Sequence, residues 1–237
     1  MARSRRTEAT LKHARFDPDE RSFGEPTKTT NLNFAEAATV AAGFKYRPVE
    51  CSGHCPTCFS RPILSYAISF DAFAPFELRE ELLFPFLTRL ANTAATKEIE
   101  IARGNFIALE TFRRVVPMFC LDVWKQPEFA ERCRAAKNNQ EAVALCLETG
   151  VETRDVGCTC VPGRAGALSG NHRNTLPFRD AYVSCCYAGV NHPDNAALGA
   201  GWVVMRCCYR ARSERRRRYF TAAAQILDEA IALGARA

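Results

Sequence analysis

In the middle of the chain, apolar residues recur every third or fourth position in three segments, a spacing that predicts helices. The first segment, Phe76 to Leu90, contains Pro85, so we expect a kink or a division at that proline. The second has its apolar positions from Ile101 to Val116 and is expected to end at Pro117. The third opens at Pro127 and runs to Gly150, a residue typical of a helix end. This part of the chain is therefore predicted to be helical.

Three other runs alternate apolar and polar residues, the period of a half-buried strand. They are Ile63 to Phe70, Ala181 to Gly189 and Trp202 to Ala211. The last two are expected to pair as a hairpin around the turn residues Asn191 to Asp194. A buried stripe after Ser213 then predicts a terminal helix.

These elements predict an α+β fold, with the helical middle region packed on a small, mostly antiparallel sheet. We expect a single domain over residues 49–237, with a long loop at about 150–178 that is rich in Gly, Ser and Asn. No internal repeat is visible. An extended N-terminal arm, residues 1–48, precedes this domain.

The arm is basic and polar, broken only by a short Ala-rich stretch from Phe34 to Ala42 that predicts a helix of two turns. A segment so poor in apolar residues cannot offset its own ordering entropy by folding alone. Phe16, Phe23 and Phe34 lie along it at intervals. These rings suit docking into successive pockets of a partner, or folding back onto the protein's own core.

Composition narrows the class of protein. A length of 237 residues with 47% hydrophobic residues suffices for a full core, and a net charge of +6 does not by itself indicate nucleic-acid binding. No window reaches eighteen uninterrupted apolar residues, so we expect no membrane insertion. Twelve cysteines without an export signal indicate reduced thiols in an intracellular, reducing compartment, either cytoplasmic or cytoskeletal. The Arg-rich residues 1–16 are also compatible with mitochondrial import.

The segment Cys51-Ser-Gly-His54-Cys55-Pro-Thr-Cys58 concentrates metal-binding residue types. The two-residue gap between Cys55 and Cys58 allows both thiolates to reach one zinc ion, with Cys51 or His54 as a third ligand. A further ligand would come from the glycine-flanked pair Cys158 and Cys160. We therefore expect either one structural zinc or no cofactor, with free thiols in a turn.

The spacing Cys51-x3-Cys55-x2-Cys58 also resembles the three-cysteine signature of radical S-adenosylmethionine enzymes. The resemblance implies a [4Fe–4S] cluster held by three thiolates. It covers only these eight residues, and the family's usual aromatic before the last cysteine is replaced by Thr57.

Near the C-terminus, seven arginines fall within thirteen residues, interleaved with Tyr209 and Tyr219. Such a cluster suits RNA phosphates with stacked bases, an acidic protein surface, or an ordinary solvated face. The arginines are Arg206, Arg210, Arg212, Arg215, Arg216, Arg217 and Arg218.

The sequence contains no Gly-x-Ser-x-Gly, His-Glu-x-x-His or Walker-type phosphate loop. We therefore predict a non-catalytic structural subunit of a large intracellular assembly, held to other protein subunits by the N-terminal arm and the Arg-rich patch. The host would be a ribonucleoprotein, including a mitochondrial ribosome, or a filament or lattice such as a microtubule wall. Two alternatives are a zinc-stabilised RNA-binding module and a cysteine- or iron–sulfur-dependent enzyme.

Overall fold

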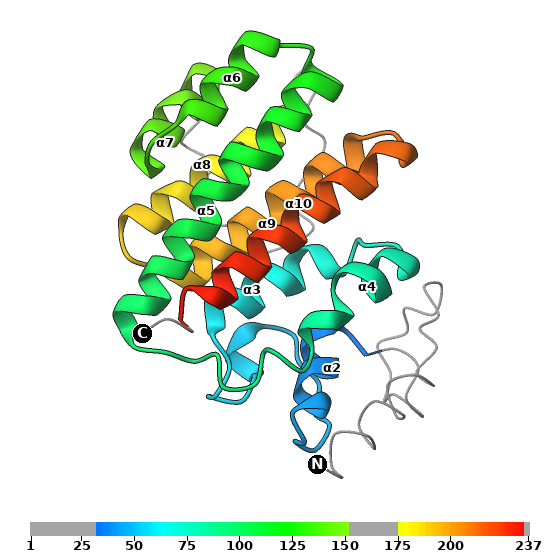
Figure 1. Ribbon diagram of the computed structural model, residues 1–237. Coiled ribbons are helices and arrows are strands. Elements are labelled where there is room, and N and C mark those ends of the chain that lie inside the picture. Colours follow the sequence, from blue (N-terminus) through cyan, green and yellow to red (C-terminus); the bar gives the residue numbers. More distant parts are fainter. Residues whose placement is uncertain (1–31, 152–174, 235–237) are drawn as a thin grey trace.

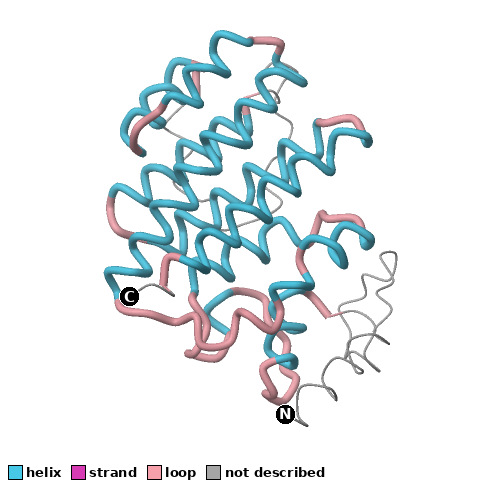
Figure 2. Tube along the Cα trace, viewed as in Figure 1, coloured by secondary structure: helices cyan, strands magenta, loops and turns pink. Residues whose placement is uncertain are grey.

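The computed structural model describes residues 32–151 and 175–234 (Figure 1). Over these residues every regular element is a helix, and no strand is present (Figure 2). The α+β prediction, with its antiparallel sheet, is therefore wrong. The main helices are α2 (Phe34–Ala41), α3 (Arg61–Asp71), α4 (Phe76–Leu82), α5 (Lys97–Phe119), α6 (Pro127–Ala135), α7 (Asn139–Glu148), α8 (Leu176–Gly189), α9 (Pro193–Arg210) and α10 (Ser213–Ala232). The described residues also contain three short helical turns: η1 (Ser52–His54), η2 (Phe84–Phe86) and the π-helical η3 (Cys120–Trp124).

The first predicted strand, Ile63 to Phe70, lies within α3. Its polar positions Ser65 and Ser69 are buried together with the apolar ones, so they do not mark a solvent-facing side. A short segment that is buried on nearly all sides has no polar face. Its sequence pattern therefore cannot distinguish the period of a strand from that of a helix.

The predicted hairpin, Ala181–Gly189 with Trp202–Ala211, is in fact the helix pair α8 and α9. Both helices carry a proline in the first turn, Pro177 and Pro193, where its fixed φ suits a helix start. The turn predicted between the two runs is present, and Asn191 adopts a φ of 57° there. It joins two helices instead of two strands.

The predicted helices exist, with different boundaries. The division near Pro85 is confirmed, since α4 ends at Leu82 and η2 follows. The predicted end at Pro117 is wrong, because α5 continues to Phe119 and then into η3. Val116 and Phe119 are buried there, and their packing outweighs the backbone hydrogen bond that a proline removes.

The third predicted helix is two helices, α6 and α7. Asn138 caps the second by accepting a hydrogen bond from the backbone N–H of Glu141 at 2.9 Å. Gly150, with a φ of 78°, follows its end as predicted. The terminal helix is confirmed as α10, whose buried positions include Phe220, Leu227 and Ile231.

Helix α9 is the centre of the bundle and packs against α3, α5, α8 and α10 (Figure 1). Two glycines in its first half permit the close approach. A Cβ at Gly199 would lie 3.1 Å from the Cβ of Ser184 on α8, and one at Gly201 would lie 2.8 Å from the carbonyl oxygen of Tyr66 on α3. A larger side chain at Gly201 would therefore require α3 and α9 to move apart, and one at Gly199 would require a small shift of α8.

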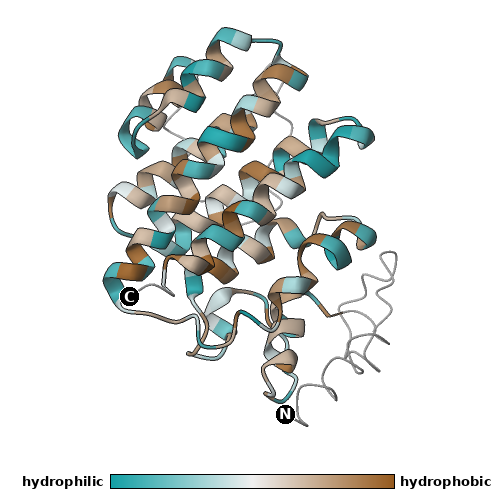
Figure 3. Ribbon diagram, in the orientation of Figure 1, coloured by the Kyte–Doolittle hydropathy of each residue, from teal (hydrophilic) through white to brown (hydrophobic). Residues whose placement is uncertain are grey.

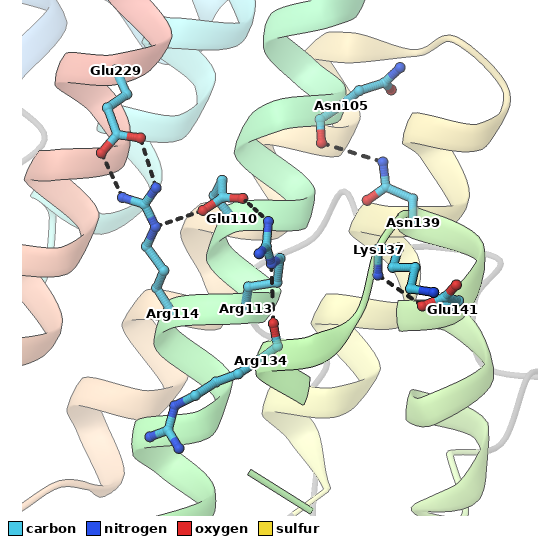
Figure 4. A network of polar contacts seen from close by, with 9 residues as sticks. All are labelled: Asn105, Glu110, Arg113, Arg114, Arg134, Lys137, Asn139, Glu141 and Glu229. Carbon is cyan, nitrogen blue, oxygen red and sulfur yellow. Dashed lines mark hydrogen bonds and ion pairs between the residues drawn. The ribbon is translucent and has the colours of Figure 1, made fainter. Parts of the chain in front are cut away.

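Charged side chains connect the outer helices to α5 (Figure 4). Glu110 on α5 accepts hydrogen bonds from Arg113 at 2.7 Å and from Arg114 at 2.6 Å. Arg114 reaches on to both carboxylate oxygens of Glu229 on α10, each at 2.7 Å. Arg113 also donates to the carbonyl oxygen of Arg134, the penultimate residue of α6. These bonds connect the long helix α5 to α10 on one side and to α6 on the other.

The two-turn helix predicted at Phe34 is confirmed as α2. Asn33 and Glu36 form a reciprocal capping box at its start. The backbone N–H of Phe34 donates to the buried carboxylate of Asp71 at 3.0 Å, and Arg79 donates to the same carboxylate at 2.7 Å. The part of the predicted arm that forms α2 therefore packs on α3, and Arg79 of α4 bonds to the carbonyl oxygen of Leu32 just before it. Residues 1–31 lie outside the described residues.

Candidate functional site

The turn between α9 and α10 is hydrophilic (Figure 3), and most of the arginines in and around it are exposed. Ala211, which is buried, ends α9 with an N–H bonded to the carbonyl oxygen of Cys207 at 2.9 Å, and Arg212 then serves as the N-cap of α10. We call the set without an ion pair the basic corner; it consists of the half-buried Arg210 and the exposed Tyr209, Arg212, Arg216 and Arg218.

Three arginines of the same run form ion pairs with carboxylates of other elements and do not belong to the corner. Arg206 lies 3.3 Å from the carboxylate of Asp180 on α8. Arg215 lies 2.8 Å from Asp122 in η3. Arg217 lies 2.5 Å from Glu81 on α4. These ion pairs hold α9 and α10 against three other elements.

Tyr219 is also engaged by a carboxylate of this chain and does not belong to the corner. Its side chain is fully buried, and its hydroxyl donates to Asp122 at 3.1 Å. Burial and the neighbouring thiols and carboxylate raise the pKa of Tyr219, so the hydroxyl stays protonated and acts as a donor. The ring is therefore not available for stacking on a base.

The arginines of the basic corner form no ion pair with any carboxylate of the described residues. Glu214 is the acidic residue in their midst, one helical turn before Arg218. The ring of Tyr209 is 73% exposed, and the guanidinium carbon of Arg210 lies 5.9 Å from its centroid. The corner thus presents guanidinium groups and an aromatic face to solvent, on two packed helices.

The cysteine segment at η1 is partly buried. Cys51 is exposed, Cys55 is buried and Cys58 is intermediate. Burial, partly opposed by Arg47, raises the pKa of Cys55 to about 11, so its thiol is protonated at neutral pH. His54 is engaged through Nδ1, which accepts from the backbone N–H of Glu50 at 3.4 Å.

No three His, Cys, Asp or Glu side chains in residues 32–151 and 175–234 are arranged to hold a metal ion. Cys158 and Cys160 lie outside the described residues, so the five-cysteine site is not assembled in the structure and the zinc site stays a prediction. Zinc content per chain in wild type and in Cys55→Ser would test it.

The remaining described cysteines are free thiols distributed through the helical bundle. Burial is the largest cause that raises the pKa of Cys146, Cys185 and Cys207, and it raises that of Cys208 to about 12. Because the thiolate is the nucleophile and the metal ligand, these protonated groups behave as small apolar core residues.

The predicted partner-binding phenylalanines are not brought together. Phe34 is completely buried in the core, so it does not project toward a partner. Phe16 and Phe23 lie outside the described residues. The sequence did not show that Asp122, Asp180 and Glu81 would take up three of the seven arginines. Only the tertiary contacts identify these pairs, since nothing in the local sequence marks them.

Searches against protein-family models, curated proteins and solved structures each return no match for this chain. Within the described residues, no helix combines the length and the apolar character needed to cross a membrane.

Proposed function

We propose that this protein is a non-catalytic subunit of a larger assembly and that it docks through the basic corner onto an acidic protein surface. The observation that carries the proposal is the division of one arginine run into two sets. Three members are paired with carboxylates of this chain, of which Asp180 and Asp122 are buried or nearly so and Glu81 is exposed, while Arg210, Arg212, Arg216 and Arg218 have no such partner among the described residues.

Arginine suits this role because its planar guanidinium binds a carboxylate through two parallel hydrogen bonds. Arginine and tyrosine are also enriched in the energetically important centres of protein interfaces. The ion pair of Arg215 with Asp122 holds the first turns of α10 against η3, and the exposed pair of Arg217 with Glu81 adds little, so the corner is partly ordered before a partner arrives. Pre-ordering lowers the entropic cost of association.

RNA is the second candidate partner, and Tyr209 is the observation that favours it. Its ring is 73% exposed beside Arg210, which suits stacking on an unpaired base while neighbouring arginines bind phosphates. An acidic protein surface would also bind the guanidinium groups, but it would not require the exposed aromatic ring.

Affinity purification of the tagged full-length chain under gentle conditions tests the proposal. The test variant is Arg212→Glu/Arg216→Glu. The matched control is Lys97→Glu/Lys137→Glu, which changes the net charge equally at exposed positions away from the corner. We expect acidic protein partners to co-purify with wild type and with the control, to persist after ribonuclease treatment, and to be lost with the test variant. Release by ribonuclease would instead favour RNA, and recovery of wild type as a lone monomer would contradict both candidates.

A further inference from the structure

An open pocket of about 590 Å³ lies between the chain that follows α2 and the turn around η1. One wall is formed by Phe44, Lys45 and Arg47. The other is formed by Gly53 and the turn from Cys55 to Cys58. Both walls belong to the end of the bundle near α2, away from the basic corner (Figure 1).

The first wall is held by backbone contacts at both ends. Gly43, with a φ of 87°, turns the chain at the end of α2, and the N–H of Phe44 bonds to the carbonyl oxygen of Thr39 at 3.2 Å. Val49 is buried, and its carbonyl oxygen accepts from the side-chain amide of Asn33 at 2.8 Å. The residues between these anchors are therefore confined to a short span.

The second wall is held from behind. The carbonyl oxygen of Cys58 accepts from the N–H of Ala94 at 3.0 Å, and Ser52 accepts a hydrogen bond at its side-chain oxygen from Ser65 of α3 at 2.7 Å. The pocket is thus largely formed before any ligand binds, as small-molecule sites usually are.

The lining combines an aromatic ring with two cations. The ring of Phe44 is 46% exposed and is backed by the buried ring of Phe59, at 6.4 Å between centroids. Lys45 and Arg47 are exposed and form no ion pair with a carboxylate of the described residues. No carboxylate occurs among the pocket's described lining residues. The pocket is therefore cationic with one apolar aromatic side.

We propose that this pocket binds a nucleotide, with the base against Phe44 and the phosphate between Lys45 and Arg47. Inorganic phosphate or an acidic side chain would use the cations but leave the exposed ring uncovered, whereas a nucleotide satisfies both. The pocket is open, so a bound nucleotide would keep one side exposed to solvent. The same chemistry is offered by a free nucleotide and by one nucleotide of a single RNA strand. The inference is independent of the function proposed for the basic corner.

Calorimetric titration of the full chain tests this site with four probes: adenosine monophosphate, adenosine, inorganic phosphate and a single-stranded RNA of about 10 nucleotides. The variants are Phe44→Leu, which keeps an apolar side chain without the aromatic face, and Lys45→Gln/Arg47→Gln. The controls are Phe73→Leu, another exposed phenylalanine, and Lys137→Gln. Circular dichroism verifies that each variant keeps its helices.

We expect the monophosphate or the RNA strand to bind more tightly than adenosine and phosphate do. Each pocket variant should weaken that binding by about tenfold, because Phe44→Leu removes the stacking face and Lys45→Gln/Arg47→Gln removes the cations that bind the phosphate. The controls should leave it unchanged. Binding of the monophosphate identifies a free nucleotide as sufficient, whereas binding of the strand alone identifies RNA as the source.

The proposal would be overturned if neither nucleotide probe bound, if adenosine bound as tightly as its monophosphate, or if the pocket variants bound like wild type. Arg212→Glu/Arg216→Glu should retain monophosphate binding, so that failure at the pocket and failure at the basic corner are distinguished.

Discussion

Arg215 donates a hydrogen bond to Asp122 at 2.8 Å, although 93 residues separate the two along the chain. Asp122 lies in the π-helical turn η3 at the end of α5, and Tyr219 donates to its second oxygen. The next residue, Arg216, is exposed and has no ion pair within the described ranges. Adjacent arginines therefore have different roles: one fastens α10 to the bundle, and the other belongs to the solvent-facing corner.

Replacing each of these arginines by alanine should separate the two roles. We expect Arg215→Ala to lower the free energy of unfolding by about 1–2 kcal/mol, because Asp122 keeps only the bond from Tyr219. The loss is modest since the Arg215 side chain is 36% exposed and its ion pair is screened. Arg216→Ala should stay within about 0.5 kcal/mol of wild type. Urea denaturation measures both, and equal losses would contradict the distinction.

Arg103 is a buried cation that joins three parts of the chain. Its side chain is 2% exposed and donates to the carbonyl oxygen of Ala230 at 3.1 Å, to that of Thr93 at 2.5 Å, and to the carboxylate of Glu100 at 2.9 Å. These bonds connect the last turn of α10 to the segment before α5.

Arg103→Met keeps the aliphatic stem but removes all of these donors. We expect a loss of about 3–5 kcal/mol in the free energy of unfolding, because two carbonyls and a partly buried carboxylate lose a charged partner. Arg132→Met is the control, since that arginine and its partner Glu148 are 52% and 48% exposed. Its loss should not exceed about 1 kcal/mol. A stability near wild type for Arg103→Met would show that water replaces the guanidinium.

Helices with one exposed face were predictable from their apolar period, as α10 shows. The central helices were not, because α3 and α9 are buried on most sides and lack a polar stripe. A helical signal was nevertheless present in α3, where Ile63, Tyr66 and Phe70 follow the i, i+3, i+7 spacing and are buried. The strand prediction rested on the alternation in the same eight residues. This helical spacing, together with Pro62 in the first turn of α3, would have favoured a helix.

The candidate site was predictable only as a density of arginine. Which of its members are free depends on carboxylates far away in sequence, such as Glu81, which lies 136 residues from Arg217. Local sequence carries no information on such pairs. The pocket beside Phe44 had a visible sequence signal, the alternation of aromatic and basic residues from Phe44 to Arg47, but the fold alone brings the η1 turn against it.

Gly201 permits the close packing of α9 against α3. The segment Gly199-Ala-Gly201 lies inside α9, where a Cβ at Gly201 would come within 2.8 Å of the Tyr66 carbonyl oxygen. We expect Gly201→Ala to cost about 1–3 kcal/mol, because α3 and α9 must move apart. Gly189→Ala is the control, since a Cβ there meets nothing within 4 Å and alanine favours a helix. It should be neutral or slightly stabilising in thermal unfolding; similar losses in both variants would exclude close packing as the cause.

Asp180 should make the stability of the protein depend on pH between about 4 and 6. It is fully buried between Arg206, at 3.3 Å, and Arg179, at 4.0 Å, with Cys207 nearby. Burial outweighs both cations and raises the pKa of this carboxyl to about 6. A carboxyl whose pKa is higher in the folded state binds its proton more tightly there. It therefore favours the folded state at low pH, and this contribution is lost as the pH rises through 6.

Asp180→Asn replaces the carboxyl with a neutral group that cannot ionise. We expect its free energy of unfolding to match that of wild type near pH 4 and to exceed it by roughly 2–3 kcal/mol at pH 7. Arg206→Gln should have the opposite effect, because removal of the cation raises the pKa of Asp180 further and extends the loss of stability to higher pH. Urea denaturation at several pH values measures these profiles. If Asp180→Asn were less stable than wild type at pH 7, the attraction to Arg206 would outweigh the cost of burying the carboxylate.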